Sequence, residues 1–370
     1  MPAVQTEQKK TNLPVQLVQQ IVTAGSLAPS GDNLQPWRFR MDGESLLVVD
    51  DRTRDHSLFN VQNLASYIAL GATLENILLA ARRYNYRADI CYFPDPQNHD
   101  LIARVSFDYG SEIDPLAEAI ERRCTNRKPY SKRPLDEATL KRLDLDSKRF
   151  SGLRLIWLRD QDSLKKLGAI VARADRLLFE NPLIHSHLFS TLRWNAEEAE
   201  ATRDGLPIET LELGALGSKA FRILKNWSVV KTLNRFGFSG LATRQSALLM
   251  RRCSAAGLLT APDTSPASFV HIGQAFQRLW LEATHAGLAL QPMTAVVFLQ
   301  LKDVLGEHDG LNAEQIPVVK SLRADLARIY RIQSGNIPAM HFRIGYAPAP
   351  SAKTVRRSIP ESGSANKEKE

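Results

Sequence analysis

The 370-residue sequence contains only three cysteines, Cys91, Cys124 and Cys253. An odd, sparse set is a poor disulfide framework, and none of the three lies in a Cys-x-x-Cys pair or in a His/Cys cluster with zinc-ligand spacing. The sequence also lacks an apolar run approaching the ~20 residues of a membrane span, and its first ten residues are polar, unlike a signal peptide. These absences predict a cytoplasmic protein without disulfides, metal site or membrane span.

Acidic residues are outnumbered, with 40 Asp and Glu against 48 Lys and Arg, and the net charge is +8. This balance suits an anionic ligand but does not require nucleic acid, for which the sequence has no recognised binding motif. The length predicts two domains or one large α/β unit. With 44% hydrophobic and 24% charged residues, the chain has an ordinary globular composition that excludes collagen, coiled-coil rods and wholesale disorder.

Hydrophobic periodicity predicts two series of helices and strands. The first consists of a helix from residue 13, strands over 39–41 and 46–49, a long helix over 61–87, and strands over 90–93 and 101–107. The second consists of a strand over 153–158, a helix over 162–181, a helix-rich stretch over 183–236, a long helix over 270–286 and a strand at 344–346. Residues 350–370 are rich in Pro, Ser, Lys and Glu, a composition that predicts a disordered tail.

The two long helices share a pattern. The segment Gly71 to Ala81 can be aligned with Gly273 to Ala283, and both begin with glycine and carry Leu and Ala at matching positions. One interpretation is a chain of two halves, each packed around an equivalent central helix. The other is two unrelated buried helices, which are common.

A proline-bracketed turn, Ala28-Pro29-Ser30-Gly31-Asp32-Asn33-Leu34-Gln35-Pro36-Trp37, follows the first helix. Ser30 and Asn33 can hydrogen-bond the edge of a heteroaromatic ring, because both offer short, directional polar groups. Pro29 and Pro36 restrict the backbone that holds them. General chemistry alone favours the alternative, a capped loop with Trp37 in the core.

Two basic motifs follow. Arg122-Arg123-Cys124-Thr125-Asn126-Arg127-Lys128 can bind an oxyanion, because guanidinium groups bind phosphate through two parallel hydrogen bonds. The alternative is a solvated basic loop. Arg356-Arg357 follows the last predicted strand, and this pair matters only if that strand returns it to Arg123.

These motifs together resemble the nitroreductase superfamily of FMN proteins. The resemblance rests on Ala28-Pro29-Ser30-x-x-Asn33-x-Gln35-Pro36-Trp37, Arg123-x-Thr125-x-Arg127, the two glycine-initiated helices, Gly287-Leu288, and Gly345-Tyr346 with Arg356-Arg357. Ordinary members place the arginine motif first and form homodimers. The reversed order here resembles the single-chain subgroup of mycobacterial Acg-like proteins, in which two half-units imitate the dimer.

The resemblance implies an α+β nitroreductase-like fold and a pseudo-dimeric monomer. The expected divisions are a flexible N-terminus over 1–12, a first half over 13–110, a second half over 111–349 with a helical lid insertion over about 183–240, and a tail over 350–370 with the basic pair.

The resemblance also implies one FMN site per chain. Arg123, Thr125 and Arg127 would hold the phosphate and ribityl chain, with Arg356 or Arg357 closing round the phosphate. Pro29, Ser30 and Asn33, with Gln35 of the same motif, would lie against the isoalloxazine, and Pro292, Met293 and Thr294 would face its N5 region. No catalytic side chain is assigned, because a flavin carries the redox chemistry itself.

The implied activity is an FMN-dependent NAD(P)H oxidoreductase that reduces a quinone, nitro compound or enone with ping-pong kinetics. No Gly-x-Gly-x-x-Gly motif is present, so the nicotinamide would be a passing substrate. The alternative is a protein that stores FMN with little or no turnover beneath the lid.

Two features of the lid region remain. A basic amphipathic helix is predicted over 218–235, with Phe221, Leu224, Trp227 and Val230 inward. It could cover the flavin or contact anionic partners, but a packed helix with a solvated face is favoured. His185-Ser186-His187 has the wrong spacing for a metal site on one helical face.

Overall fold

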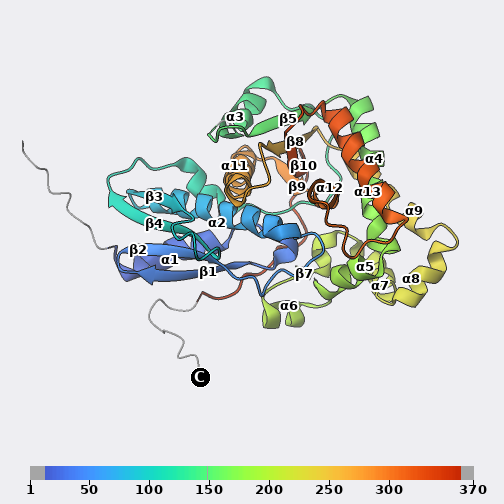
Figure 1. Cartoon of the computed structure of the whole chain (residues 1–370), viewed down its shortest axis with the longest axis horizontal. Coiled ribbons are helices and arrows are strands. Elements are labelled where there is room, and N and C mark those ends of the chain that lie inside the picture. The colour runs from blue at the N-terminus through green and yellow to red at the C-terminus, as the bar shows by residue number, and fades with distance from the viewer. Residues whose placement is uncertain (1–12, 148, 360–370) are drawn as a thin grey trace, which may run out of the picture.

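Two four-stranded antiparallel sheets form the frame of the molecule (Figure 1). The computed structural model describes residues 13–147 and 149–359. The first sheet has the order β1-β2-β4-β3 and consists of β1 (Trp37–Asp42), β2 (Ser45–Asp50), β3 (Tyr86–Tyr92) and β4 (Leu101–Tyr109). The second has the order β5-β8-β10-β9 and consists of β5 (Arg154–Leu158), β8 (Ala255–Ala261), β9 (Ala289–Pro292) and β10 (Ile337–Gly345).

The two sheets repeat one topology. Each half contributes two strands, a long helix and two more strands, and the last strand of each half lies between the second and the third. The long helices are α2 (Leu64–Arg83) and α11 (Pro266–His285), and a shorter helix precedes each half, α1 (Val15–Ser26) or α3 (Glu137–Ser147). The predicted α+β fold of two similar half-units is therefore confirmed.

The long helices pack against each other at the centre of the molecule. Gly71 of α2 and Gly273 of α11 meet there, and the aligned residues are thus also paired in space. The segment Val61–Arg83 is in fact long and apolar enough to cross a membrane, contrary to the expectation from the sequence, but 94% of its most apolar window is buried inside the protein. Because it is covered on all sides, its apolar character reflects its place in the core.

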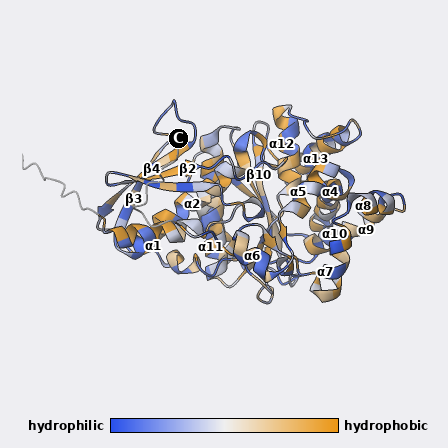
Figure 2. Ribbon diagram, turned by 90° about the horizontal axis from the view of Figure 1, so that it is seen from below, coloured by the Kyte–Doolittle hydropathy of each residue, from blue (hydrophilic) through white to orange (hydrophobic). Residues whose placement is uncertain are grey.

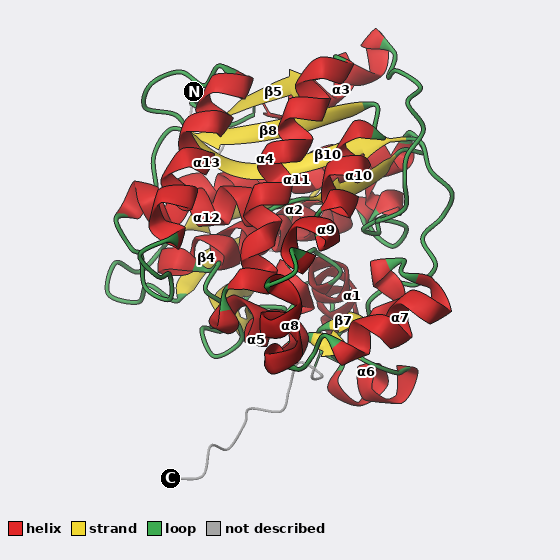
Figure 3. Ribbon diagram, turned by 90° about the vertical axis from the view of Figure 1, so that its right-hand side faces the viewer, coloured by secondary structure: helices red, strands yellow, loops and turns green. Residues whose placement is uncertain are grey.

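The two halves differ in the connection between their first and second strands. A tight turn with Gly43 at φ 58° connects β1 and β2, whereas residues 159–254, called here the insertion, connect β5 and β8. The insertion forms a two-stranded parallel ribbon, β6 (Leu192–Arg193) and β7 (Leu206–Pro207), and helices at one end of the molecule (Figures 1 and 3). These helices are α4 (Gln161–Glu180), α5 (Pro182–Ser190), α6 (Ala196–Thr202), α7 (Gly214–Ile223), α8 (Trp227–Asn234), α9 (Phe238–Ala242) and α10 (Arg244–Arg251).

One helix predicted in the insertion is wrong. The expected single helix over 218–235 is divided into α7 and α8, because the side chain of Asn226 accepts a hydrogen bond from the backbone N–H of Ser228 and starts a new helix. Strands β8 and β9 and helices α3, α12 (Ala295–Leu305) and α13 (Gln315–Tyr330) were not predicted. Strand β8 is buried at every position, so it lacks the polar–apolar alternation that identifies a half-exposed strand.

Candidate functional site

The chain that follows β10 runs back across the molecule and is fixed there. The side-chain amide of Asn126 donates to the Pro348 carbonyl over 2.8 Å, and that of Asn33 donates to the Val355 carbonyl over 2.9 Å. Residues 350–359 are therefore held in place, although composition predicts disorder for them; residues 360–370 of the predicted tail, like the predicted N-terminal segment 1–12, lie outside the described residues. This path returns Arg356 to the arginine motif.

Arg123 and Arg356 both donate hydrogen bonds to backbone carbonyls of the turn at the end of α1. Nη2 of Arg123 donates to the Leu27 carbonyl over 3.0 Å, and its guanidinium lies 4.5 Å from the centre of the Trp280 ring. Arg356 donates through Nε to the Ser26 carbonyl and through Nη2 to the Ala28 carbonyl, both over 3.1 Å. The two motifs, more than 200 residues apart in sequence, thus meet at one turn.

Arg127 adds a third cation to this region, and the charges of Asp32 and Glu212 lie near enough to favour its charged form. It donates to the Thr210 carbonyl over 3.2 Å and, with Arg123, flanks Cys124 and Thr125 in the arginine motif. Among the described residues, no carboxylate forms an ion pair with any of the three arginines. Nε of Arg123, which is only 8% exposed, has no hydrogen-bond partner there either.

The cluster remains positive at neutral pH. Burial, and then the charge of Arg356, lower the pKa of Arg123 to about 9, and burial lowers the pKa of Arg356 to about 10. A buried charge without a partner has lost its hydration, which destabilises the folded protein. An anion with several acceptor oxygens would offset this loss by accepting hydrogen bonds from the guanidinium groups. A phosphate group fits this donor set, because guanidinium groups bind it in a bidentate manner.

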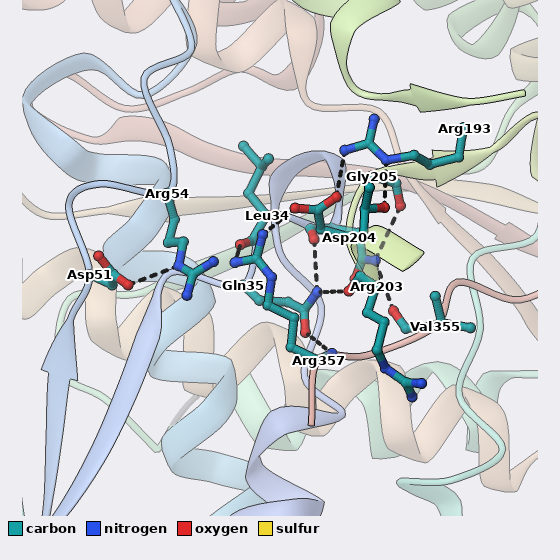
Figure 4. A network of polar contacts seen from close by, with 12 residues as sticks. Leu34, Gln35, Asp51, Arg54, Arg193, Arg203, Asp204, Gly205, Val355 and Arg357 are labelled. Atoms are coloured by element: carbon teal, nitrogen blue, oxygen red, sulfur yellow. Dashed lines mark hydrogen bonds and ion pairs between the residues drawn. The ribbon is translucent and has the colours of Figure 1, made fainter. Parts of the chain in front are cut away.

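Arg357 has a different environment from Arg356. Its Nη2 pairs with Asp204, and the other oxygen of Asp204 pairs with Arg193 of β6 (Figure 4). Of the two candidates for closing round a phosphate, the structure therefore places Arg356 among the uncompensated arginines. Arg357 instead shares the carboxylate of Asp204 with Arg193 of the insertion.

The amides of Asn33 and Gln35 hold two distant segments. Nδ2 of Asn33 also donates to the Gly205 carbonyl over 3.1 Å, and its Oδ1 accepts from Arg356 over 2.7 Å. Nε2 of Gln35 donates to the Arg203 carbonyl over 2.8 Å, and its Oε1 accepts from the backbone N–H of Arg357 over 2.9 Å (Figure 4). The turn over 203–205 and the C-terminal segment are thus fixed to the first motif.

The backbone conformation of the 203–205 turn depends on glycine. Gly205 has φ 68°, and a Cβ at this position would lie 2.4 Å from the Thr191 carbonyl oxygen. The preceding Arg203 also has a positive φ, 52°. The Asp204-Gly205 pair is the sequence signal for such a turn, but nothing in the sequence identifies its partner.

The remaining predicted site residues lie beside these contacts. Oγ of Ser30 accepts from the backbone N–H of Gln35 over 3.0 Å, and Pro29 next to it is half-buried. Thr125 forms a parallel bridge with Leu290 of β9. Three predicted site residues beyond Gln291, at and after the end of β9, are half-buried: Pro292, Met293 and Thr294. The bridge makes the arginine motif and β9 neighbours.

Sequence reasoning missed His187 as part of the site. From α5, its Nε2 lies 3.0 Å from Oδ2 of Asp32 in the first motif. Burial lowers the pKa of His187, but the hydrogen bond to Asp32 and the charges of Asp32 and Asp55 outweigh it and raise the pKa above its ordinary value. This contact is a third attachment of the insertion to the first motif.

Comparison with known proteins gives distant relatives along most of the chain. No protein-family profile matches. An uncharacterised Mycobacterium tuberculosis protein is 26% identical over 352 residues, which is 92% of this chain but 48% of that protein, so the chain spans about half its length. A candidate NAD(P)H nitroreductase of M. tuberculosis is 24% identical to this chain, and the alignment covers 92% of this chain and 89% of that protein. Acg, another candidate NAD(P)H nitroreductase of M. tuberculosis, is 25% identical over 78% of this chain and 83% of its own length.

Solved structures are more distant. The FMN-dependent nitroreductase NfnB from Mycobacterium smegmatis, in complex with NADPH, is 15% identical over 63% of this chain and 89% of its own, with a TM-score of 0.35. A nitroreductase with bound FMN from Desulfitobacterium hafniense is 10% identical over 66% of this chain and 94% of its own, also with a TM-score of 0.35.

Proposed function

We propose that this chain, an Acg-like member of the nitroreductase superfamily, is an FMN-dependent oxidoreductase. It would take electrons from NAD(P)H and pass them to a small organic acceptor such as a quinone, a nitro compound or an enone, in the cytoplasm. The observation that carries the proposal is the cluster of buried Arg123 with half-buried Arg127 and Arg356, none of which forms an ion pair with a carboxylate among the described residues. The M. tuberculosis relatives that are candidate NAD(P)H nitroreductases support the same class of activity.

The three arginines would hold the FMN phosphate, and the Thr125 hydroxyl would face the ribityl chain. Pro29 and Ser30 would lie along the ring system, opposite the segment Pro292 to Thr294. Asn33 and Gln35 would act chiefly by positioning, since their amides are engaged with backbone groups and with Arg356. Bound FMN supplies reversible two-electron chemistry, so no acid–base pair of side chains is required.

The nicotinamide would enter and leave in each cycle. The sequence has no dinucleotide-binding glycine motif, and the chain would offer donor and acceptor the same opening in turn. We therefore expect ping-pong kinetics.

Storage of FMN without turnover is the second candidate. The insertion is tied to the first motif at three places, through Gly205 to Asn33, Arg203 to Gln35, and His187 to Asp32. A lid held this firmly could close the face that a substrate needs. The two candidates predict the same cofactor and opposite responses to NAD(P)H.

The test is the visible spectrum of the purified protein, followed by anaerobic addition of NADH and of NADPH. A flavin spectrum that bleaches within seconds supports the oxidoreductase, and one that stays oxidised supports storage. The double variant Arg123→Ala/Arg127→Ala should lose the flavin. The matched control is Arg122→Ala, because Arg122 is an exposed neighbour. Colourless wild-type protein that takes up no added FMN would contradict both candidates.

A further inference from the structure

One end of the molecule carries most of its exposed large apolar side chains. Of the eleven among the described residues, seven lie between residues 213 and 248: Leu213, Leu216, Ile223, Leu233, Phe236, Leu241 and Leu248. They belong to α7, α8, α9, α10 and the turns beside them, at the same end of the molecule (Figures 2 and 3). Single exposed apolar residues are ordinary, but a concentration on neighbouring helices marks an interaction surface. We call these seven residues the end patch.

Helix α7 is the least packed part of the end patch. None of its residues is buried. Leu216 and Ile223 are two helical turns apart and therefore share a face, and they are 83% and 63% exposed. Phe236, after α8, is 85% exposed. A short helix gains most of its stability from covering an apolar face, so this surface would be stabilised by a partner.

The segment that carries the end patch is basic. A carboxylate from outside it, Glu180 of α4, accepts from Oγ of Ser239 on α9 and is paired with Arg176 of α4. Residues 213–262 contain no Asp or Glu and eight Lys and Arg: Lys219, Arg222, Lys225, Lys231, Arg235, Arg244, Arg251 and Arg252. All eight are exposed. Figure 2 shows hydrophilic and hydrophobic segments side by side along these helices. The partner must therefore offer both negative charge and apolar contact.

We propose that the end patch docks on the surface of an anionic lipid bilayer. Such a surface attracts lysine and arginine and admits leucine and phenylalanine side chains between its headgroups. A second copy of the chain would bring two cationic faces together with no acidic residue between 213 and 262 to compensate them. A nucleic acid would satisfy the charge and leave the apolar side chains exposed. The proposal does not depend on the proposed function.

The test is co-sedimentation of the full chain with vesicles of phosphatidylcholine alone and of phosphatidylcholine mixed with phosphatidylglycerol. We expect binding to the mixed vesicles only, weakening as salt is added. The triple variant Lys219→Gln/Lys225→Gln/Lys231→Gln should bind roughly fivefold more weakly per lysine, about a hundredfold in all. Leu216→Asp and Phe236→Asp should each also weaken binding, because they remove the apolar contact.

Two controls separate the end patch from total charge and from exposed apolar surface in general. The variant Lys141→Gln/Lys165→Gln/Lys166→Gln removes the same charge from exposed positions on α3 and α4, and Ile113→Asp changes an exposed apolar residue outside the end patch. Both should bind as wild type. Substitutions at exposed positions usually change stability little. An unchanged midpoint of thermal unfolding for each variant would exclude misfolding as the cause of weaker binding.

Three results would overturn the proposal. The first is equal binding, or none, with the two kinds of vesicle at low salt. The second is a dimer in analytical ultracentrifugation that Phe236→Asp dissociates, which would assign the end patch to self-association. The third is binding to a single-stranded oligonucleotide that is lost in the lysine variant and kept in Phe236→Asp, with no binding to vesicles.

Discussion

Gly71 and Gly273 lie opposite each other where α2 crosses α11, and their surroundings mirror each other. A Cβ added to Gly71 would lie 2.0 Å from the carbonyl oxygen of Val270, and one added to Gly273 would lie 2.0 Å from that of Ile68. In each case the obstructing carbonyl belongs to the residue three positions before the opposite glycine. This reciprocity is the signature of a two-fold axis between half-units, here within one chain.

Gly71→Ala and Gly273→Ala should each destabilise the protein strongly. The added carbon meets backbone, which cannot move away without separating the two helices, so we expect a loss of about 3 kcal/mol or more in the free energy of unfolding. The matched control is Gly240→Ala on α9, where a Cβ meets nothing within 4 Å; it should be neutral or raise stability by about 0.5–1 kcal/mol. Urea denaturation measures all three, and similar values for the core and control variants would contradict the close helix contact.

The sequence carries enough information to predict the duplicated fold. The alignment of Gly71 with Gly273 leaves two interpretations open, and the resemblance carried by the motifs decides between them and implies which loops meet. The details escape prediction because they depend on contacts over long sequence separations. Asn33 and Gln35 bond the backbone of residues 203–205, some 170 residues away, and backbone acceptors leave no trace in the side-chain sequence.

The basic pair illustrates the same limit. Arg356 and Arg357 are adjacent and chemically identical, and they differ only in their distant partners: Arg356 bonds the turn after α1, whereas Arg357 pairs with Asp204.

Strand β8 escaped prediction for a different reason, because complete burial removes the alternation of polar and apolar residues.

Arg356→Ala should weaken FMN binding far more than Arg357→Ala. Arg356 lies beside Arg123 with its charge uncompensated, whereas Arg357 pairs with Asp204. A charge-assisted hydrogen bond contributes about 1.5–3 kcal/mol, which corresponds to roughly a 10- to 150-fold rise in the FMN dissociation constant for the Arg356 variant. Fluorescence titration of apoprotein with FMN measures it, and equal losses in the two variants would contradict the distinct roles.

Asp204→Asn should loosen the 203–205 turn. Asp204 is 14% exposed and carries the charges of both Arg193 and Arg357, so its loss leaves two cations without a partner. We expect destabilisation of about 1–3 kcal/mol and faster proteolysis at this turn. The control is Glu200→Gln, which breaks a solvent-exposed pair with Arg203 and should cost less than about 1 kcal/mol. Cleavage of both variants at the same rate would exclude the proposed role of Asp204.

The attachment of α5 to the first motif should weaken as pH rises. Because the pKa of His187 is higher in the folded protein than its ordinary value of 6.5, the folded state binds this proton more tightly than the unfolded state does. The resulting stabilisation is fully present below pH 6.5 and is lost as pH increases through the raised pKa. Thermal unfolding followed across this range should therefore show a falling midpoint.

His187→Gln should remove that component of the pH dependence, and Asp32→Asn should remove most of it, since Asp55 also contributes to the shift. The double variant should differ little from His187→Gln, because both changes abolish one interaction. His99→Gln, at an exposed histidine, should leave the profile unchanged. The contrary outcome is a midpoint of His187→Gln that falls with pH as steeply as that of the wild type. Another group would then carry the titration, and the His187–Asp32 pair would be a structural hydrogen bond whose strength does not depend on charge.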